Sequence, residues 1–232
     1  MIRTAEPYDW PFISKISEIA GYDDYINAIG PSYMDNGQVL VYEMDGNIAG
    51  FLKMETLPDN SSWLSGLRVH PDFRRRSVAT KLTEEAISKS RESGRRKVRL
   101  LVQHNNLKSL SLVAKLGFKT VSDFIFFQGI PEPVHETENV VTGEFPKMIN
   151  MGWVFSEPVP EVLKKCQFFQ TPGNGIVLRC GRDAWQVIRP SLSMAFAGHE
   201  FSSMEIHGQI PEYLEQHISP DFDRGSIYEL PL

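Results

Sequence analysis

The order of apolar and polar positions predicts alternating strands and helices over the first 128 residues. A short strand begins at Ile2, and longer apolar runs predict strands at 39–44, 48–54, 63–69, 97–103 and 118–127. Apolar spacings of three and four residues predict helices over about 12–20, 78–93 and 106–116. Asp45-Gly46-Asn47 is typical of a tight hairpin turn, and Gly94 and Gly117 are placed to end two of the helices. This order indicates a mixed α+β sheet with at least one helical crossover.

The pattern changes after Gly129. Residues 130–139 contain two prolines and three acidic residues without an apolar period, which is typical of a linker, expected over 130–146. Short apolar stretches then recur between Pro and Gly turns, at 152–155, 175–179, 184–188 and 226–230. Short helices are expected near Val162 and at 211–217. We therefore expect three parts, 1–129, 130–146 and 147–232, the last a small α+β domain.

Composition is that of an ordinary globular chain, with 41% hydrophobic and 23% charged residues. No apolar run reaches the roughly 18 residues of a membrane span, and the first residues lack the apolar core of a secretory signal. Cys166 and Cys180 are the two cysteines, too few for a disulfide scaffold or a four-cysteine zinc site. These features predict reduced thiols, no membrane partner and a cytoplasmic location.

Charge is divided unevenly along the chain, whose net charge is −5. Residues 1–130 hold 17 Lys/Arg and 15 Asp/Glu, whereas residues 131–232 hold 7 and 14. The acidic second half disfavours broad nucleic-acid binding and is compatible with a cationic substrate. An acidic surface that only promotes solubility is the plainer interpretation.

The most informative segment runs from Trp63 through a basic loop into the helix that follows. Backbone N–H groups of residues 75–79 and the positive end of the helix dipole would together suit a pyrophosphate group. Three consecutive arginines, Arg74, Arg75 and Arg76, would add charge-assisted contacts. The alternative for each arginine is exposure to solvent or an ion pair with Glu84 or Glu85.

Two motifs give this segment a family resemblance. Arg74-x-x-Ser77-x-Ala79, and Asn106-x-x-Ser109-x-x-Leu112-Val113-x-Lys115-Leu116-Gly117-Phe118 farther along, resemble the two signatures of the GNAT N-acetyltransferase superfamily over about residues 2–128. The resemblance implies a GNAT-type α+β fold, a mostly antiparallel sheet with flanking helices, that uses acetyl-CoA as acetyl donor. The donor-binding positions that it implies are Leu67, Arg68, Val69, Arg74, Arg75, Arg76, Ser77, Val78, Ala79, Thr80, Asn106 and Ser109. The alternative role of Asn106 is a helix cap alone.

Two positions depart from the family pattern. Ser77 stands where the family most often has glycine, and Val113 stands where it has the tyrosine that protonates the leaving thiolate. A valine cannot donate a proton, so another donor is needed, or the thiolate leaves unassisted. Tyrosines of the loop that often borders substrate in this fold are candidates for substrate contact: Tyr22, Tyr25 and Tyr33.

No carboxylate lies in the strand 63–69, so the proton acceptor must come from elsewhere. His104, at the end of the strand 97–103, is the best candidate for a catalytic role in proton transfer, and His70 ranks below it. The plain alternative for His104 is an exposed or packed histidine. The other histidines lack the spacing of metal ligands, so no metal is expected.

These observations predict an enzyme that transfers an acetyl group from acetyl-CoA directly to a primary amine of a small molecule or peptide. The alternative on the same fold is a non-catalytic acyl-CoA sensor, favoured by Val113 and by the absent strand carboxylate. A nucleic-acid-associated factor that uses the basic segments 74–76 and 95–97 is a third, less favoured possibility. The sequence carries no signal for a particular oligomeric state.

Overall fold

The computed structural model describes residues 1–21, 25–35, 37–133, 135–137 and 145–232. Its contacts divide the chain into two compact units. The first unit comprises residues 1–100, 111–119 and 229–232, and the second comprises 101–110 and 120–228. This division differs from the predicted boundaries at 129 and 147. Secondary-structure elements contribute residues to both units, namely β5 (Lys97–Gln103), α4 (Leu107–Lys115) and β14 (Arg224–Pro231).

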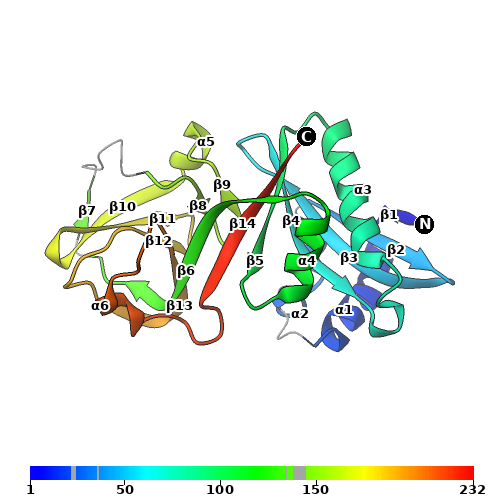
Figure 1. The fold of residues 1–232 in the computed structure, drawn as a ribbon, viewed down its shortest axis with the longest axis horizontal. Helices are drawn as coiled ribbons and strands as arrows, with labels where there is room; N and C mark the ends of the chain where they lie inside the picture. The colour runs from blue at the N-terminus through cyan, green and yellow to red at the C-terminus, as the bar shows by residue number, and fades with distance from the viewer. Residues whose placement is uncertain (22–24, 36, 134, 138–144) are drawn as a thin grey trace. The chain divides into compact units, whose positions relative to one another are not determined.

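In the first unit, the strands that lead up to β5 follow one another in the sheet (Figure 1). They are β1 (Ile2–Thr4), β2 (Gln38–Met44), β3 (Asn47–Thr56) and β4 (Ser61–Val69). Neighbours from β1 to β4 are antiparallel, whereas β4 and β5 are parallel. The predicted hairpin between β2 and β3 is confirmed. Asp45 and Gly46 have φ of 53° and 76°, the two positive values that a type I′ turn requires.

Helices cover both faces of this sheet. On one face, α1 (Trp10–Ile19), α2 (Tyr25–Ile29) and the short helix 30–34 pack onto the odd-numbered apolar residues of β2 and onto Phe51. On the other face lies α3 (Val78–Glu92), whose Lys81 Nζ donates to the Tyr42 hydroxyl at 3.2 Å. Because side chains alternate along a strand, Val41 and Tyr42 belong to opposite faces. The basic loop that precedes α3 is therefore held by a helix packed on the sheet.

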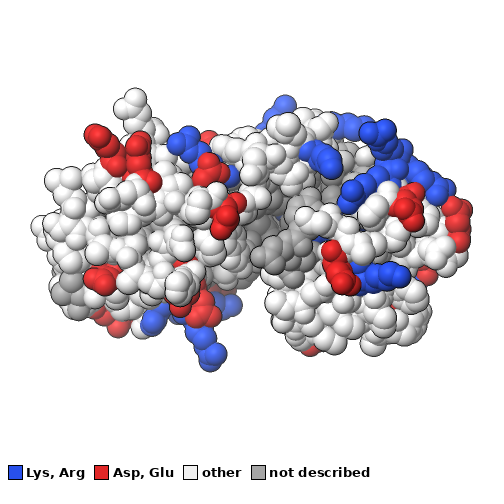
Figure 2. All heavy atoms as spheres, turned by 90° about the horizontal axis from the view of Figure 1, so that it is seen from below, with Lys and Arg blue, Asp and Glu red and all other residues white. Residues whose placement is uncertain are grey.

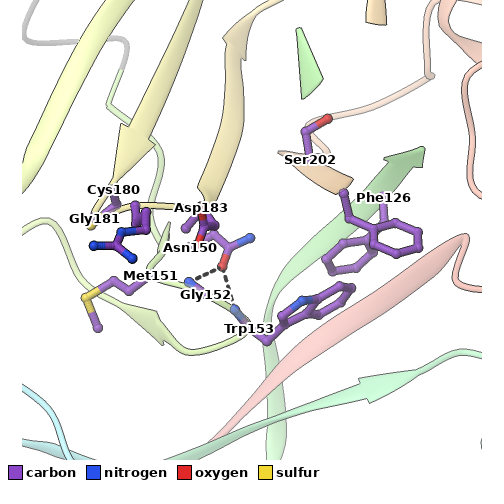
Figure 3. A pocket seen from close by; sticks show the side chains of 12 residues that line it. Phe126, Asn150, Met151, Gly152, Trp153, Cys180, Gly181, Asp183 and Ser202 are labelled. Carbon is purple, nitrogen blue, oxygen red and sulfur yellow. Dashed lines mark hydrogen bonds between the residues drawn. The ribbon is translucent and has the colours of Figure 1, made fainter. Parts of the chain in front are cut away.

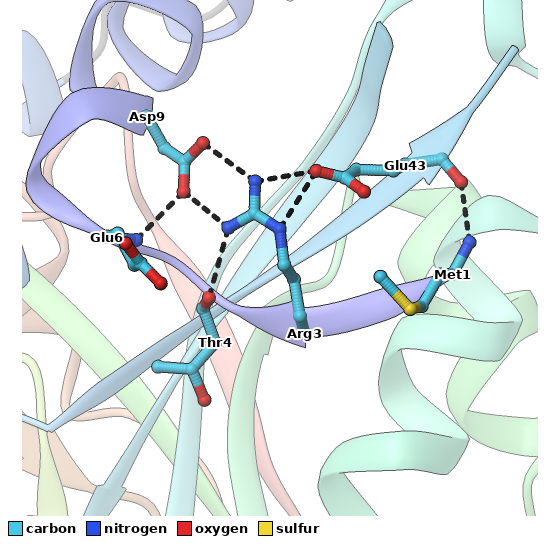
Figure 4. Close-up of polar contacts among 6 residues, drawn as sticks. All are labelled: Met1, Arg3, Thr4, Glu6, Asp9 and Glu43. Atoms are coloured by element: carbon cyan, nitrogen blue, oxygen red, sulfur yellow. Dashed lines mark hydrogen bonds and ion pairs between the residues drawn. The ribbon is translucent and has the colours of Figure 1, made fainter. Parts of the chain in front are cut away.

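A hydrogen-bonded ion cluster ties the N-terminal strand to the helix that follows it (Figure 4). Arg3 donates to both carboxylate oxygens of Asp9, at 2.6 and 2.9 Å, and to Glu43 Oε1 through Nε and Nη2. Asp9 is 2% exposed and also accepts the backbone N–H of Glu6 at 2.8 Å. The hydrogen bonds from Arg3 hold the pKa of the Asp9 carboxyl below its usual value.

We predict that Asp9→Asn lowers the free energy of unfolding at neutral pH by about 1–3 kcal/mol, because a buried charge-assisted pair is lost. Since the folded-state pKa of Asp9 is lowered, its contribution is complete above the unfolded-state value of about 3.9. It is lost as pH falls through the folded-state pKa. Urea unfolding near neutral pH and at about pH 3 should show the difference between variant and wild type shrinking in acid. A difference that stays constant would contradict this assignment.

A second buried ion cluster joins residues that are distant in sequence: Asp59 between β3 and β4, Arg99 in β5 and Glu229 in β14. Arg99 of β5 is fully buried, and its Nη1 donates to the equally buried carboxylate of Asp59. Its Nε donates to Glu229 Oε2 of β14 at 2.6 Å, and Lys97 Nζ lies 3.5 Å from the same oxygen. Glu229 of β14 thereby supplies a second carboxylate for the buried Arg99 guanidinium of the first unit.

The second unit is built on a sheet of order β14-β6-β13-β12-β11-β10-β7. The strands that have not yet been placed are β6 (Lys119–Pro131), β7 (His135–Glu136), β10 (Cys166–Thr171), β11 (Gly175–Cys180), β12 (Ala184–Arg189) and β13 (Phe196–Glu205). A two-stranded sheet of β8 (Ile149–Asn150) and β9 (Phe155–Ser156) accompanies it. β12 and β13 are parallel, and β10, β11 and β12 are antiparallel.

The expected linker is partly strand. Residues 130 and 131 pair with Ala197 and Phe196 of β13, and β7 pairs with β10. Pairing with strands that are distant in sequence thus makes these residues part of the sheet, although their own composition favours a linker. The remaining residues of the predicted linker include 134 and 138–144, which lie outside the described residues.

Two apolar cores lie on the two faces of this second sheet. Val177, Trp185 and Val187 pack in one core with Leu214 of α6 (Glu212–Glu215). Leu178 packs in the other with Val162 of α5 (Pro160–Leu163). Val177 and Leu178 are neighbours in β11 but pack in different cores, as expected for a sheet that is covered on both faces.

Candidate active site

The end of β4 carries a bulge. Arg68 pairs with Phe51 and Ser65 pairs with Lys53, so Gly66 and Leu67 together lie opposite the single residue Leu52. Gly66 has φ of +61°, and a Cβ built at this position would lie 2.0 Å from the hydroxyl oxygen of Tyr33. The bulge therefore requires glycine for both its backbone angle and its close contact.

We predict that Gly66→Ala lowers kcat/KM by about a hundredfold, because displacing the bulge by about an ångström moves the backbone of Leu67. Steady-state acetyl transfer is the measurement, with circular dichroism as the check on folding. The double variant Gly66→Ala/Tyr33→Phe removes the clashing hydroxyl and should recover part of the loss. Equal activity of the single and double variants would show that this contact does not set the bulge.

Among the described residues, β4 pairs with β5 at three positions, Ser61, Ser62 and Trp63. β4 itself continues to Val69, with β3 as its antiparallel partner. Leu67, Arg68 and Val69 thus lie beyond the positions at which β4 pairs with β5. A strand edge of this kind can pair with an amide-containing ligand arm.

The loop between β4 and α3 has an alternating backbone. Arg75 and Ser77 have positive φ, 61° and 62°, whereas Arg74 is extended, with φ of −63° and ψ of 155°. Successive backbone N–H groups in a turn can form an anion-binding concavity. The Ser77 side chain makes no capping hydrogen bond, and the first helical bond runs from Lys81 N–H to Ser77 O at 3.0 Å. The N–H groups of Val78, Ala79 and Thr80 therefore lie in the first turn, where an α-helix offers donors to an anion.

The three arginines of this loop differ in their surroundings. Arg76 pairs with Asp45 Oδ2 at 2.9 Å and lies over the ring of Phe73, and Arg74 Nη2 donates to Ala20 O at 3.2 Å. Within the described part of the chain, the side chain of Arg75 has no hydrogen bond or ion pair. The expected alternative partners were Glu84 and Glu85, but the partners are instead Asp45 and a backbone carbonyl. Figure 2 shows Lys and Arg residues gathered on the face of the first unit drawn there.

The start of α4 shows which asparagine caps the helix. Asn106 Oδ1 accepts the Ser109 N–H at 3.2 Å, so Asn106 caps the helix. At the other end, Gly117 has φ of +83°, and Phe118 N–H donates to Val113 O in a Schellman arrangement. Val113 is 3% exposed and packs as a core residue. No hydroxyl is available at that helix position.

His104 belongs to the second unit and lies in a hydrogen-bonded row with Ser226 and Asp123. Its Nε2 lies 2.8 Å from Ser226 Oγ, and the Ser226 hydroxyl donates to Asp123 Oδ1. Because the single hydroxyl proton goes to Asp123, Nε2 must carry the proton of the first bond. Nδ1 is then the ring nitrogen that can accept a proton. Ser226 is not placed to act as a nucleophile activated by His104.

The candidate tyrosines that the structure describes differ in their exposure. Tyr22 lies outside the described residues. Tyr25 is 48% exposed at the start of α2, whereas Tyr33 is 2% exposed and packs in the core below the bulge. Lys53 Nζ donates to the Tyr33 carbonyl at 2.7 Å. Tyr33 therefore supports the site from beneath, and Tyr25 is the exposed member of the described pair.

One acidic residue was missed by the sequence reasoning. Glu55 lies in β3, directly opposite Trp63 of β4. Its burial raises the pKa of the carboxyl, and the charge of Lys53 opposes this effect. A carboxylate with a raised pKa is a candidate for proton transfer, and Glu55 lies opposite Trp63, four residues before Leu67 in β4. The available signal was a carboxylate in an otherwise apolar strand beside a lysine.

The second unit contains a cavity of about 270 Å³ (Figure 3). Trp153, 42% exposed, has φ of +63° and stacks on Phe126 with ring centroids 5.0 Å apart. Asn150 Oδ1 fixes this turn by accepting the N–H groups of Gly152 and Trp153 at 3.0 and 2.9 Å. The cavity is lined by aromatic, small and charged residues: Phe126, Asn150, Met151, Gly152, Trp153, Cys180, Gly181, Arg182, Asp183, Ala184, Phe201 and Ser202.

Within the described residues, no group of three or more His, Cys, Asp or Glu side chains is arranged to hold a metal ion. Every helix of the described chain is too short or too polar to cross a membrane.

Comparison with known proteins gives a match to a family model and a likeness of fold. The model of the acetyltransferase (GNAT) family matches residues 5–118. A candidate acetyltransferase from Thermoplasma acidophilum is 18% identical, with a TM-score of 0.66 over 100% of both chains. A candidate acetyltransferase from Pyrococcus horikoshii is 14% identical, with a TM-score of 0.60 over 100% of this chain and 89% of its own. These two likenesses confirm the predicted α+β fold.

A further solved structure is an N-acetyltransferase from Thermoplasma acidophilum in complex with coenzyme A. It is 19% identical and covers 52% of this chain and 90% of its own, with a TM-score of 0.46. No curated protein matches the sequence.

Proposed function

We propose that this chain, whose residues 5–118 match the model of the acetyltransferase (GNAT) family, transfers an acetyl group from acetyl-CoA directly to a primary amine of a small molecule or peptide. The observation that carries the proposal is the start of α3. There a helix N-terminus without a side-chain cap follows a loop in which Arg75 and Ser77 have left-handed backbone. This arrangement suits a diphosphate, because it offers donors and a positive helix end without a side chain that occupies them.

Other residues of the two motifs would hold the rest of the donor. Arg75 is exposed and has no described partner, so its guanidinium is available to a phosphate group. Asn106 uses Oδ1 as a cap, which leaves its amide N–H₂ as the group for a ligand contact. The Ser77 Cβ stands in a left-handed backbone position that glycine adopts without strain. We therefore expect the donor to bind, with weaker affinity than in a Ser77→Gly variant.

Bound acetyl-CoA would supply the activated acetyl thioester. The backbone of the β4 bulge, at Leu67 and Val69, would present N–H groups to the thioester oxygen as negative charge develops there. His104 through Nδ1 and Glu55 through its carboxylate are the two candidates to accept the proton of the amine. With Val113 buried, a thiolate can leave without a phenol, since the reference pKa of a thiol is about 8.5.

The test is release of free coenzyme A thiol from acetyl-CoA in the presence of a panel of primary amines, including α-amino peptides, lysine peptides and polyamines. Turnover that requires an amine, with the acetyl group recovered on nitrogen, is the expected result. Saturable acetyl-CoA binding in calorimetry without turnover on any amine would instead favour the acyl-CoA sensor.

We predict that one of two matched variants, His104→Gln or Glu55→Gln, lowers kcat by about 10²–10⁴. Because a base acts only when deprotonated, the variant that removes it also removes the acid limb of the pH profile of kcat/KM. The other variant should keep that limb and change kcat by less than about threefold. Preservation of the limb in both variants would exclude both residues as the base.

A further inference from the structure

The two cysteines of the chain face each other across the β10–β11 hairpin. Cys166 and Cys180 are direct partners in the strand register. One residue beyond them on each strand, Gly181 N–H donates to Lys165 O at 3.1 Å. In an antiparallel ladder, a hydrogen bond between the residues one position beyond Cys166 and Cys180 means that these two cysteines form a non-hydrogen-bonded pair. Such pairs have their Cα atoms about 4.5 Å apart and their side chains closest together.

This spacing is compatible with a disulfide, since bridged cysteines have Cα atoms about 4.4–6.8 Å apart. Both sulfurs are free thiols here. Cys180 is 3% exposed and packs in the core that contains Val162, whereas Cys166 is partly exposed and lies 3.3 Å from the Val162 carbonyl oxygen. A small reagent can therefore reach Cys166 first, with Cys180 held beside it.

The environment also favours a thiolate within the pair. The neighbouring Cys166 thiol lowers the pKa of Cys180, burial opposes this effect, and the positive charge of Lys165 adds to it. The neighbouring Cys180 and burial raise the pKa of Cys166. A thiolate is the nucleophile in thiol–disulfide exchange.

We propose that Cys166 and Cys180 form a redox-active dithiol that small disulfides oxidise to an intramolecular disulfide and that thiols reduce again. One cysteine sulfur attacks a small disulfide, RSSR, forming a mixed disulfide and releasing RS⁻. The second cysteine sulfur then attacks the protein sulfur of that mixed disulfide and releases the second RS⁻. The two cysteine protons pass to the released thiolates, so one RSSR is reduced to two RSH for each protein disulfide formed. This inference is independent of the acetyl-transfer proposal.

The pair also borders the cavity of the second unit. Cys180 and Gly181 lie in its wall, on the side away from Trp153 (Figure 3). A covalent bond at Cys180 would fix this part of the wall to β10. The oxidation state of the pair would thereby affect the wall of this cavity.

The experiment incubates the reduced full-length protein with oxidised glutathione, quenches with acid, blocks remaining thiols with N-ethylmaleimide and measures the intact mass. The expected product has lost two hydrogen atoms and carries neither maleimide nor glutathione. Proteolysis should release the peptides of Cys166 and Cys180 joined together, and dithiothreitol should separate them. Oxidation in native buffer should be at least about tenfold faster than in urea, because the fold places the sulfurs together.

Single variants test each half of the reaction. In Cys180→Ser, Cys166 should accumulate a stable glutathione adduct, because the sulfur that resolves it is gone. In Cys166→Ser, adduct formation at buried Cys180 should be slower. The proposal is overturned if wild-type protein keeps both thiols, retains glutathione adducts or forms disulfide-linked dimers, or if urea does not slow the reaction.

Discussion

Replacing Ser77 with glutamate is expected to weaken acetyl-CoA binding by about a hundredfold, which corresponds to roughly 3 kcal/mol. The new carboxylate would stand at the N-cap of α3, where the backbone N–H groups and the helix dipole are proposed to receive a diphosphate. A unit charge about 4 Å from another costs about 4 kcal/mol at an effective dielectric of about 20, so a loss of this size is physically reasonable. Isothermal titration of the purified protein with acetyl-CoA measures it.

Two variants at the same position serve as controls. Ser77→Gln has nearly the size of glutamate without its charge and should lose no more than about tenfold, which separates charge from bulk. Ser77→Gly should bind at least as tightly as wild type, because glycine adopts the φ of 62° found here without strain. Equal affinities of the Glu and Gln variants would mean that no phosphate lies against this helix end.

Replacing Arg99 with methionine is expected to lower the free energy of unfolding by about 3–5 kcal/mol. The change leaves the buried carboxylate of Asp59 and that of Glu229, which is 16% exposed, without their shared guanidinium. A buried carboxylate that loses its partner keeps its desolvation cost, which is why removal of one member is so destabilising. Urea unfolding followed by circular dichroism is the measurement.

Lys97→Met is the matched control, because it also removes a positive charge next to Glu229. Lys97 contacts the same Glu229 oxygen at 3.5 Å, but its side chain is 24% exposed, so its loss should cost less than about 1 kcal/mol. Adding Asp59→Asn to Arg99→Met should restore part of the lost stability, since it removes the unpaired charge. If the two single variants are equally stable, the cluster does not contribute as its burial implies.

The elements that were predicted correctly are those set by neighbouring residues. The Asp45-Gly46 turn and the end of α4 at Gly117 each depend on a few consecutive side chains and backbone angles. The position of the basic loop between β4 and α3 was also predicted from sequence, whereas its role stays a prediction. The left-handed backbone at Arg75 and Ser77 was not foreseen, since neither residue type favours it.

Features that depend on distant residues were missed. β10 and β13 were not predicted, and part of the expected linker became strand, because their pairing partners lie far along the chain. His104 was singled out by residue type, but its bond to Ser226, 122 positions away, fixes which ring nitrogen is available. Tyr33 was expected at the substrate surface, yet the absent Cβ of Gly66 admits it to the core. Local composition carries no information about such contacts.

The partnership of Arg99 with a residue 130 positions later has a consequence for how the protein is made. During synthesis, β1 to β5 emerge from the ribosome long before Glu229 does, so the nascent first unit holds a guanidinium whose second carboxylate has not been translated. Its final stability is therefore reached only after β14 has been synthesised. Until then, Asp59 is the one carboxylate of this cluster that can pair with Arg99.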